Sequence, residues 1–167
     1  ASNPFAVYEQ GDNKGILEFD LDQGLIPDYR DYYSSQSISN QVSEIFRVFI
    51  DDNFLYIVTD KGLYKSSLGQ NKKLQSSWEL VFASASLLDG ISIYNKIFLL
   101  TSDKILSIYN DDSFDQVDVS FEVLKFKKSN NILLAYSQSE VVSISEDLLI
   151  NELFSINFSD ISTYLIS

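Results

Sequence analysis

The chain has 167 residues, of which 24 are acidic and 12 basic, and it contains no histidine, cysteine or methionine. Without histidine and cysteine it cannot build a Cys/His zinc site, a Ser-His-Asp or Cys-His catalytic centre, or a disulfide. A net charge of -12 argues against nucleic acid or an anionic membrane as the main partner, because both bind basic surfaces. No apolar run approaches the ~20 residues of a membrane helix, so membrane insertion is not expected.

Short apolar runs dominate the chain. They are rich in Val, Ile, Leu, Phe and Tyr, and polar residues separate them at a spacing of roughly eight to twelve residues, which is typical of strands in all-β domains. In chain order the clearest runs are residues 46–50, 54–58, 97–100, 105–109, 121–126, 132–136 and 141–144. Helical spacing is not sustained, and the nearest helix candidate, residues 83–88, is too short to be convincing. The sequence predicts an all-β fold.

The predicted strands repeat as hairpins. One further strand is expected on either side of each hairpin, and four antiparallel strands per repeat of about 36 to 47 residues are typical of a β-propeller blade. The first two turns, Asn13-Lys14-Gly15 and Asp60-Lys61-Gly62, suit a type I turn followed by a bulge in which glycine takes a positive φ. The matching segments are residues 13–17 with 60–64 (shift 47), 55–65 with 97–107 (shift 42), and 105–108 with 141–144 (shift 36).

We therefore expect one β-propeller segment of about four four-stranded antiparallel blades. An incomplete blade 1 that lacks its innermost strand is expected at about residues 1–40, blade 2 at 41–84, blade 3 at 85–120 and blade 4 at 121–157. Residues 158–167 are expected to form one more inner strand. This strand either pairs with blade 1 and closes a four-bladed ring, or starts the next blade. We favour a larger propeller, completed by the remaining blades of a longer chain, because four blades is the small end of the known range.

The hairpin Leu55-Tyr56-Ile57-Val58-Thr59-Asp60-Lys61-Gly62-Leu63-Tyr64 resembles the blades of the two-component-regulator propeller family. In that family a Tyr-Ile-Gly-Thr-x-x-Gly-Leu pattern marks the second and third strands, and residues 15–21 resemble the same element. Within the family, the chain is similar to the N-terminal propeller of type IX secretion outer-membrane propeller proteins. The later repeats depart from the pattern, because Lys104 and Glu140 replace the glycine and no second strand contains tryptophan.

The resemblance implies a non-catalytic interaction scaffold of a bacterial extracytoplasmic protein, in the periplasm or at the cell surface. Such a protein is linked to type IX secretion or cell-surface attachment and recognises a protein partner, a surface glycan or lipopolysaccharide. The start at Ala1 instead of Met is expected for a processed exported protein or a piece of a longer one. No phosphate loop, dinucleotide fingerprint or nucleophile elbow occurs, so neither enzyme activity nor a cofactor is expected. A cytosolic WD-type scaffold lacks support, because the chain has no Gly-His or Trp-Asp dipeptide.

A tyrosine-rich acidic loop is the most site-like cluster. In it, Asp28 and Asp31 stand beside Tyr29, Tyr32 and Tyr33, a composition that can stack and hydrogen-bond sugars. A carbohydrate-active propeller, which binds or hydrolyses a glycan at this loop, is therefore the alternative function. Hydrolysis requires two carboxyl groups about 5 to 10 Å apart, one of them with a raised pKa. The same tyrosines also suit an outer strand that packs on the neighbouring blade.

Charged residues are expected on the two turn faces of the blades. On one face, Lys14, Lys61 and Lys104 occupy nearly equivalent turn positions, where they can meet an anionic group of a ligand or be balanced by neighbouring acids. The carboxylates of the other face can bind Ca²⁺, or they can be solvent-exposed side chains on tight turns, where Asp is favoured. We favour solvation, so no metal site is expected; these acids are Asp20, Asp22, Asp51, Asp52, Asp111, Asp112, Asp115, Glu146 and Asp147. Trp78 is expected to pack between blades.

Overall fold

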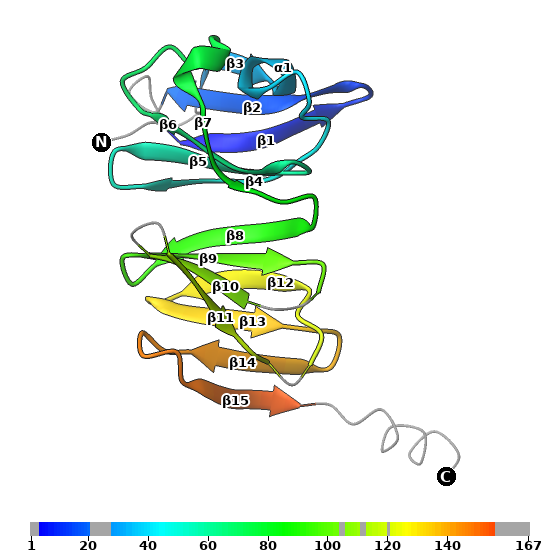
Figure 1. Ribbon diagram of the computed structural model, residues 1–167, viewed down its shortest axis with the longest axis vertical. Coiled ribbons are helices and arrows are strands. Elements are labelled where there is room, and N and C mark those ends of the chain that lie inside the picture. The colour runs from blue at the N-terminus through cyan, green and yellow to red at the C-terminus, as the bar shows by residue number, and fades with distance from the viewer. Residues whose placement is uncertain (1–3, 21–27, 104–105, 111–112, 120, 156–167) are drawn as a thin grey trace. The chain divides into compact units, whose positions relative to one another are not determined.

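The computed structural model describes residues 4–20, 28–103, 106–110, 113–119 and 121–155, with residues 28, 29, 106–110 and 113 described by their backbone only (Figure 1). Within these residues the chain forms fifteen strands, one four-residue α-helix and one 3-10 turn. The prediction of an all-β fold is confirmed.

The strands form four antiparallel sheets, and in each sheet the strands are neighbours in chain order. Sheet 1 contains β1 (Phe5–Gln10), β2 (Asn13–Asp20) and β3 (Asp28–Ser34). Sheet 2 contains β4 (Ile45–Asp51), β5 (Phe54–Thr59), β6 (Gly62–Ser67) and β7 (Glu79–Ala83). Sheet 3 contains β8 (Leu87–Ile93), β9 (Lys96–Thr101), β10 (Leu106–Asn110) and β11 (Ser113–Val117). Sheet 4 contains β12 (Lys125–Ser129), β13 (Ile132–Tyr136), β14 (Glu140–Ile144) and β15 (Ile150–Ser155).

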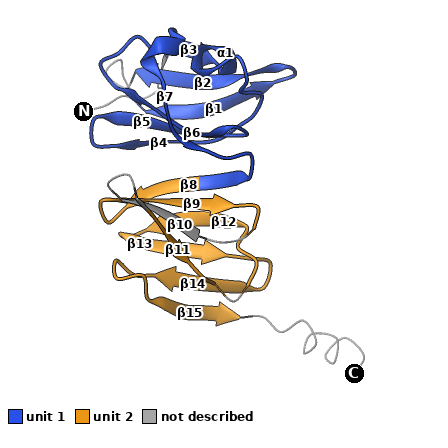
Figure 2. Ribbon diagram, in the orientation of Figure 1, with its two compact units in different colours: residues 1–89 blue, residues 90–167 orange. Residues whose placement is uncertain are grey.

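The chain divides into two compact units, residues 1–89 and residues 90–167 (Figure 2). In unit 1, sheets 1 and 2 share one apolar cluster that also takes in Trp78, so the expectation that Trp78 packs between sheets is confirmed. The indole Nε1 donates a hydrogen bond to the Lys72 carbonyl at 3.0 Å, which satisfies the buried polar atom. The buried members of this cluster are Ile16, Ile38, Val42, Ile45, Leu55, Ile57, Tyr64 and Trp78.

Unit 2 has its own core between sheets 3 and 4. Tyr94 ties the two sheets together, because its hydroxyl donates to the Ile144 carbonyl at 3.1 Å and accepts from the Leu133 amide at 3.3 Å. The buried members of this cluster are Ile91, Ile93, Phe98, Leu100, Val117, Val123, Phe126, Leu133, Ala135, Val142 and Ile144.

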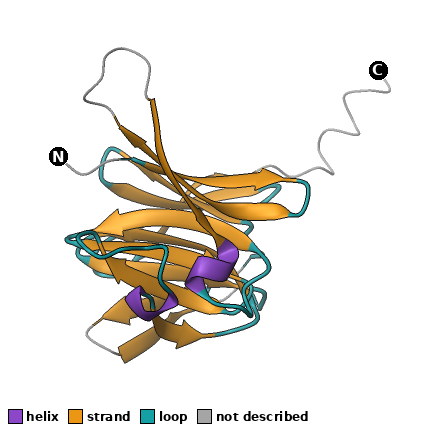
Figure 3. Ribbon diagram, turned by 90° about the horizontal axis from the view of Figure 1, so that it is seen from above, coloured by secondary structure: helices purple, strands orange, loops and turns teal. Residues whose placement is uncertain are grey.

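Two short helical turns in unit 1, α1 (Ser35–Ile38) and η1 (Gln75–Ser77), have no counterpart in the sequence prediction (Figure 3). Ser34 caps α1, since its hydroxyl accepts from the Ser37 amide at 3.3 Å. Gln75 joins the two turns by donating to the Gln36 carbonyl at 2.7 Å. Segments this short have no helical period, so the hydrophobic pattern could not reveal them.

For the second hairpin the turn prediction is correct in the positive φ of Gly62 and wrong in the expected bulge, and for the first hairpin it is wrong. Gly62 has the expected positive φ, +138°, and follows the two-residue turn Asp60-Lys61 without a bulge against β5. In the first hairpin the turn is formed by Gly11-Asp12, and Gly15 lies inside β2 without a positive φ. The two repeated glycines share another feature. A Cβ at Gly15 would lie 2.4 Å from the Tyr33 carbonyl oxygen, and a Cβ at Gly62 2.0 Å from that of Phe82, so the outer strand requires glycine in both sheets.

Candidate functional site

A polar pocket of about 220 Å³ opens on sheet 2 where β5 begins. Cross-strand pairing assembles most of it, because β6 places Ser67 opposite Phe54 and Lys65 opposite Glu79. The segment that carries η1 adds further hydroxyl groups. We call this site the serine pocket; its lining residues are Phe54, Lys65, Ser66, Ser67, Gln70, Ser76, Ser77, Trp78 and Glu79.

The aromatic ring of Phe54 is the apolar surface of the serine pocket, and 38% of the residue is exposed. The Lys65 ammonium lies 5.4 Å from the ring centroid and 3.3 Å from the Glu79 carboxylate. The Tyr56 ring lies next to that of Phe54 on the same strand, tilted at a centroid distance of 6.4 Å, and itself stacks on Phe49 at 5.4 Å. Burial raises the pKa of Tyr56, and the carboxylate charge of Asp51 adds to this effect. The phenol of Tyr56 therefore stays neutral, and the Phe54 ring is held by Tyr56 of its own strand and by Lys65 of β6.

The chemistry of the serine pocket suits binding better than bond cleavage. An exposed aromatic face stacks on the apolar face of a sugar ring, while hydroxyl and amide groups exchange hydrogen bonds with its edges. Glu79 is the only carboxylate among the lining residues, and it is paired with Lys65. Glycoside hydrolysis uses two carboxyl groups, one of which needs a raised pKa. The pocket therefore offers recognition without an acid–base pair.

The tyrosine-rich segment is not the loop that the sequence predicted. Residues 28–34 form β3, which pairs along β2, and its tyrosines suit this role because aromatic residues favour strands. The side chains of Asp28 and Tyr29 lie outside the described residues. Consecutive residues of a strand face opposite sides, so Tyr32 lies on one face of sheet 1, and Asp31 and Tyr33 lie on the other. Because these residues are close in the sequence, they were predicted to form one cluster. In the structure they belong to a strand, which places them on two opposite faces of the sheet.

Asp31 and Tyr33 make contacts that stabilise unit 1. The Asp31 carboxylate lies 2.7 Å from the Lys73 ammonium and accepts from the Tyr32 amide at 2.9 Å. Burial acts to raise the pKa of Asp31, but the hydrogen bonds from Lys73 and Tyr32 outweigh it and the pKa is lowered. Tyr33 is buried and its hydroxyl donates to the Glu18 carboxylate; burial and this bond raise its pKa. A lowered pKa does not suit Asp31 to the role of a glycosidase acid.

Tyr32 lines a second depression, of about 440 Å³, on the face of sheet 1 that points away from sheet 2. Its ring meets Tyr8 edge to face at 5.6 Å, and its hydroxyl donates to the Lys14 carbonyl at 3.0 Å. The ring occupies the space that a side chain at Gly15 would need. We call this depression the tyrosine groove; it is lined by Tyr8, Asn13, Leu17 and Tyr32. None of these four residues carries a charge.

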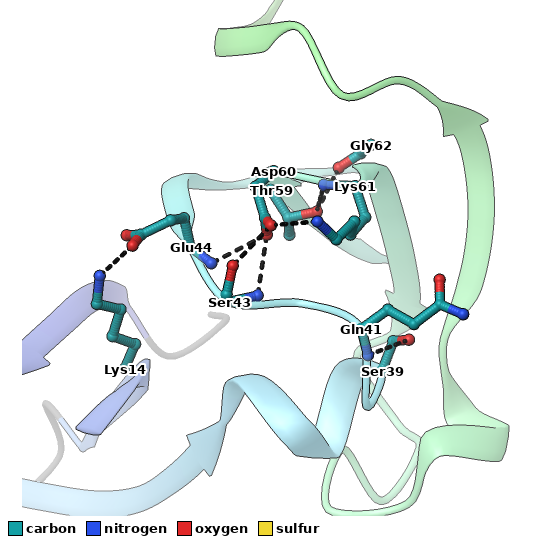
Figure 4. Close-up of polar contacts among 9 residues, drawn as sticks. All are labelled: Lys14, Ser39, Gln41, Ser43, Glu44, Thr59, Asp60, Lys61 and Gly62. Atoms are coloured by element: carbon teal, nitrogen blue, oxygen red, sulfur yellow. Dashed lines mark hydrogen bonds and ion pairs between the residues drawn. The ribbon is translucent and has the colours of Figure 1, made fainter. Parts of the chain in front are cut away.

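The predicted lysines are balanced by acids in the structure (Figure 4). Lys14 pairs with Glu44 and, at 3.3 Å, with Glu9, and the bond to Glu44 raises its pKa. These partners replace the neighbouring Asp12 that the sequence suggested. Lys61 lies 2.7 Å from Asp60. Lys104 lies outside the described residues. The two described lysines therefore match the charge-balanced turns that were the alternative to an anion site.

Asp60 organises the turn between β5 and β6 (Figure 4). Its carboxylate accepts hydrogen bonds from the Ser43 amide at 3.0 Å, the Ser43 hydroxyl at 2.7 Å and the Glu44 amide at 2.9 Å. Burial acts to raise the pKa of Asp60, but Lys61 and the Ser43 and Glu44 donors outweigh it, and the pKa lies well below its usual range. These hydrogen bonds connect Ser43 and Glu44, which precede β4, to the turn of the second hairpin.

No group of three acidic side chains suited to hold a metal ion occurs in the part of the chain that the structure describes. Of the predicted acidic face, Asp22, Asp111 and Asp112 lie outside that part. Among the described residues no helix is long and apolar enough to cross a membrane.

Sequence reasoning missed the serine pocket. None of the predicted site residues that the structure describes belongs to its lining. Its residues are scattered between positions 54 and 79 and carry no motif, and they meet because β6 pairs with β5 on one side and with β7 on the other. The one available signal was the serine-rich stretch at residues 66–77 beside an aromatic strand start.

Comparisons with known proteins show the fold. No protein-family model matches the sequence, and no curated protein matches it either. Among solved structures, PorZ of Porphyromonas gingivalis, an essential surface component of the type-IX secretion system, superposes with a TM-score of 0.65 at 10% identity; the match covers 89% of this chain and 20% of PorZ.

Two further structures match at similar levels. The AfRom2 CNH domain has a TM-score of 0.57 at 11% identity, over 93% of this chain and 56% of that one. The N-terminal domain of Nup159 has a TM-score of 0.56 at 14% identity, over 90% of this chain and 41% of that one. The chain thus spans between one fifth and just over half of these proteins. With its meander sheets and these neighbours, the chain has the β-propeller fold.

Proposed function

We propose that this chain is part of a non-catalytic interaction scaffold, a bacterial surface-associated β-propeller protein linked to type IX secretion or cell-surface attachment. The observation that carries the binding role is the serine pocket, where an exposed phenylalanine ring lies among hydroxyl groups. The similarity to PorZ supports the cellular setting, because that protein is a surface component of the type-IX secretion system.

A neutral glycan is the ligand that fits the serine pocket best. A volume of about 220 Å³ is the size of a single sugar ring rather than of an extended chain. Lys65 and Glu79 neutralise each other, so the pocket has no net preference for a charged ligand. A net charge of -12 on the whole chain also disfavours phosphorylated or carboxylated sugars. A protein partner is the other class of ligand for such a scaffold.

The test is a calorimetric titration of purified surface glycans into the chain, with two matched variants. Phe54→Ala removes the stacking surface and is expected to weaken binding about fivefold, since an aromatic contact contributes on the order of 1 kcal/mol. Phe46→Ala is the control, because Phe46 is a phenylalanine of unit 1 with similar exposure, 40%, and lies outside the pocket. Equal affinities for the two variants would show that the serine pocket does not bind the glycan.

A carbohydrate-active propeller that uses Asp28 and Asp31 remains the second candidate function. Tyrosines beside carboxylates are its support in the sequence. The pairing of Asp31 with Lys73 and its lowered pKa weigh against it, since these features keep the carboxylate ionised and engaged.

A further inference from the structure

A pocket of about 340 Å³ lies in unit 2 between the turn that joins β13 to β14 and the segment that precedes β12. A hydrogen bond from the Leu124 amide to the Tyr136 carbonyl, at 2.9 Å, links the two segments. Phe121 packs against the core of unit 2, so one wall of the pocket is anchored there. We call this site the Glu140 pocket; its described lining residues are Phe121, Glu122, Leu124, Ser137, Gln138, Ser139 and Glu140.

The turn that positions Glu140 is held by Ser137. The Ser137 hydroxyl accepts hydrogen bonds from the Ser139 amide at 3.1 Å and the Glu140 amide at 3.0 Å, and the Ser137 amide donates to the Glu140 carbonyl at 2.9 Å. Glu140 is the first residue of β14, and alternate residues of a strand share a face. Its side chain therefore lies on the same side as Val142 and Ile144, which belong to the core of unit 2. The backbone thus directs a carboxylate to the rim of an apolar core.

One oxygen of this carboxylate is buried without a partner. In the part of the chain that the structure describes, Glu140 Oε2 is the one buried side-chain polar atom with no hydrogen bond. None of the ion pairs among the described residues involves Glu140. A carboxylate oxygen that loses water and gains no donor costs free energy. A ligand that donates to Oε2 removes this cost, so the orphaned oxygen marks a binding position inside the pocket.

The composition of the Glu140 pocket selects an organic cation. Glu122 adds a second carboxylate, and no lysine or arginine occurs among the described lining residues. Phe121 supplies an aromatic ring, and Leu124, 42% exposed, supplies an apolar surface for an alkyl stem. The volume matches the small end of organic ligand sites. Ca²⁺ fits less well, because it needs about six to eight oxygen ligands and the lining has two carboxylates. The net charge of -12 also attracts cations.

We propose that the Glu140 pocket binds the guanidinium group of an arginine side chain on a protein partner. A guanidinium is planar, so it donates paired hydrogen bonds to a carboxylate and also stacks on an aromatic ring. Glu140 and Phe121 provide these two surfaces in one pocket. The proposal is independent of the glycan proposed for the serine pocket, because that pocket belongs to sheet 2 in the other unit.

The test is an NMR titration of the 167-residue chain with the peptide acetyl-Gly-Arg-Gly-amide, followed at the backbone amide signals. The matched control peptide contains citrulline in place of arginine, which keeps the shape and removes the charge. Glu140→Gln removes the charge of the pocket. Glu146→Gln is the control variant, because Glu146 is an exposed glutamate of unit 2 outside the described lining.

The arginine peptide is expected to shift the signals of residues 121–124 and 137–140 with a Kd on the order of 1 mM. Glu140→Gln should weaken binding at least about tenfold, as expected for hydrogen bonds to a charged group, and Glu146→Gln should not. Equal affinity for the citrulline peptide, or equal affinity of wild type and Glu140→Gln, would overturn the proposal. Displacement of the arginine peptide by CaCl₂ at the same signals would also overturn it, because a metal ion would then be the occupant.

Thermal unfolding without peptide gives an independent check of the unpartnered carboxylate. Glu140→Gln is expected to leave the unfolding midpoint unchanged or to raise it, because the charge that it removes has no partner in the free chain. A midpoint several degrees lower would show that the carboxylate is satisfied within the protein, and the proposal would then fail.

Discussion

At the scale of single residues, Asp60 is the clearest case of a side chain whose charge holds local structure together. Four donors converge on it: the Ser43 amide and hydroxyl, the Glu44 amide and the Lys61 ammonium. Its side chain is 16% exposed, so water replaces these partners poorly. The sequence repeat pointed to Lys61 and Gly62 as the notable residues of this turn. In the structure, Asp60 makes most of the contacts that hold the turn in place.

Asp60→Asn is expected to lower the free energy of unfolding at pH 7 by about 2 kcal/mol, the usual contribution of hydrogen bonds to a charged group. Because the folded-state pKa is lowered, the stabilisation is complete above the ordinary carboxyl pKa of about 4 and is lost as the pH falls through the folded-state value. Urea unfolding of wild type and variant at several pH values measures this. The difference between them should shrink below pH 4.

The matched control for this experiment is Asp103→Asn, a change at an exposed turn acid of unit 2. It should change the free energy of unfolding by less than about 0.5 kcal/mol at any pH. A difference between wild type and Asp60→Asn that stays constant from pH 7 to pH 3 would mean that the carboxylate charge is not what holds the turn.

At the scale of elements, the repeated glycine is a packing requirement of the outer strand. Gly62→Ala is expected to lower the free energy of unfolding by about 2 kcal/mol or more, because a methyl group would collide with the Phe82 carbonyl and an L-residue is strained at φ +138°. Gly69→Ala is the control, since nothing lies within 4 Å of its Cβ position. Thermal unfolding of both variants measures the effect, and similar midpoints would refute this role for Gly62.

Strands were the elements that the sequence predicted well, and the reason is local. Runs such as residues 54–58 and 132–136 combine β-branched and aromatic residues between polar turns, which suits few structures other than a strand. The turn of the first hairpin was predicted at Asn13-Lys14-Gly15, but it lies at Gly11-Asp12. Gly15 matches Gly62 in the repeat because both lie against a carbonyl of the outer strand, not because both lie in a turn. The prediction that residues 28–33 form one tyrosine-rich cluster was wrong for a similar reason. The pairing of this segment with β2 makes it a strand, and a strand divides its side chains between two faces. A single sequence does not show which residues of different strands come into contact.

At the scale of the whole molecule, the propeller fold does not specify the function. PorZ, Nup159 and AfRom2 all contain domains that match this chain at 10 to 14% identity. Function must therefore be argued from particular sites. In this chain, the serine pocket is the site on which the proposed recognition of a glycan rests. The lining of the serine pocket contains one carboxylate, that of Glu79, which is paired with Lys65.

The most direct test of this account is whether a glycan that binds to the protein is released chemically unchanged. The glycan that titrates into the chain is incubated with it for many binding half-lives and then analysed by mass spectrometry, alongside the variants Phe54→Ala and Asp31→Asn. A non-catalytic scaffold returns the glycan intact, binds it more weakly after Phe54→Ala, and is unaffected by Asp31→Asn. Cleaved or transferred glycan that disappears with Asp31→Asn would contradict the account and would make the chain an enzyme.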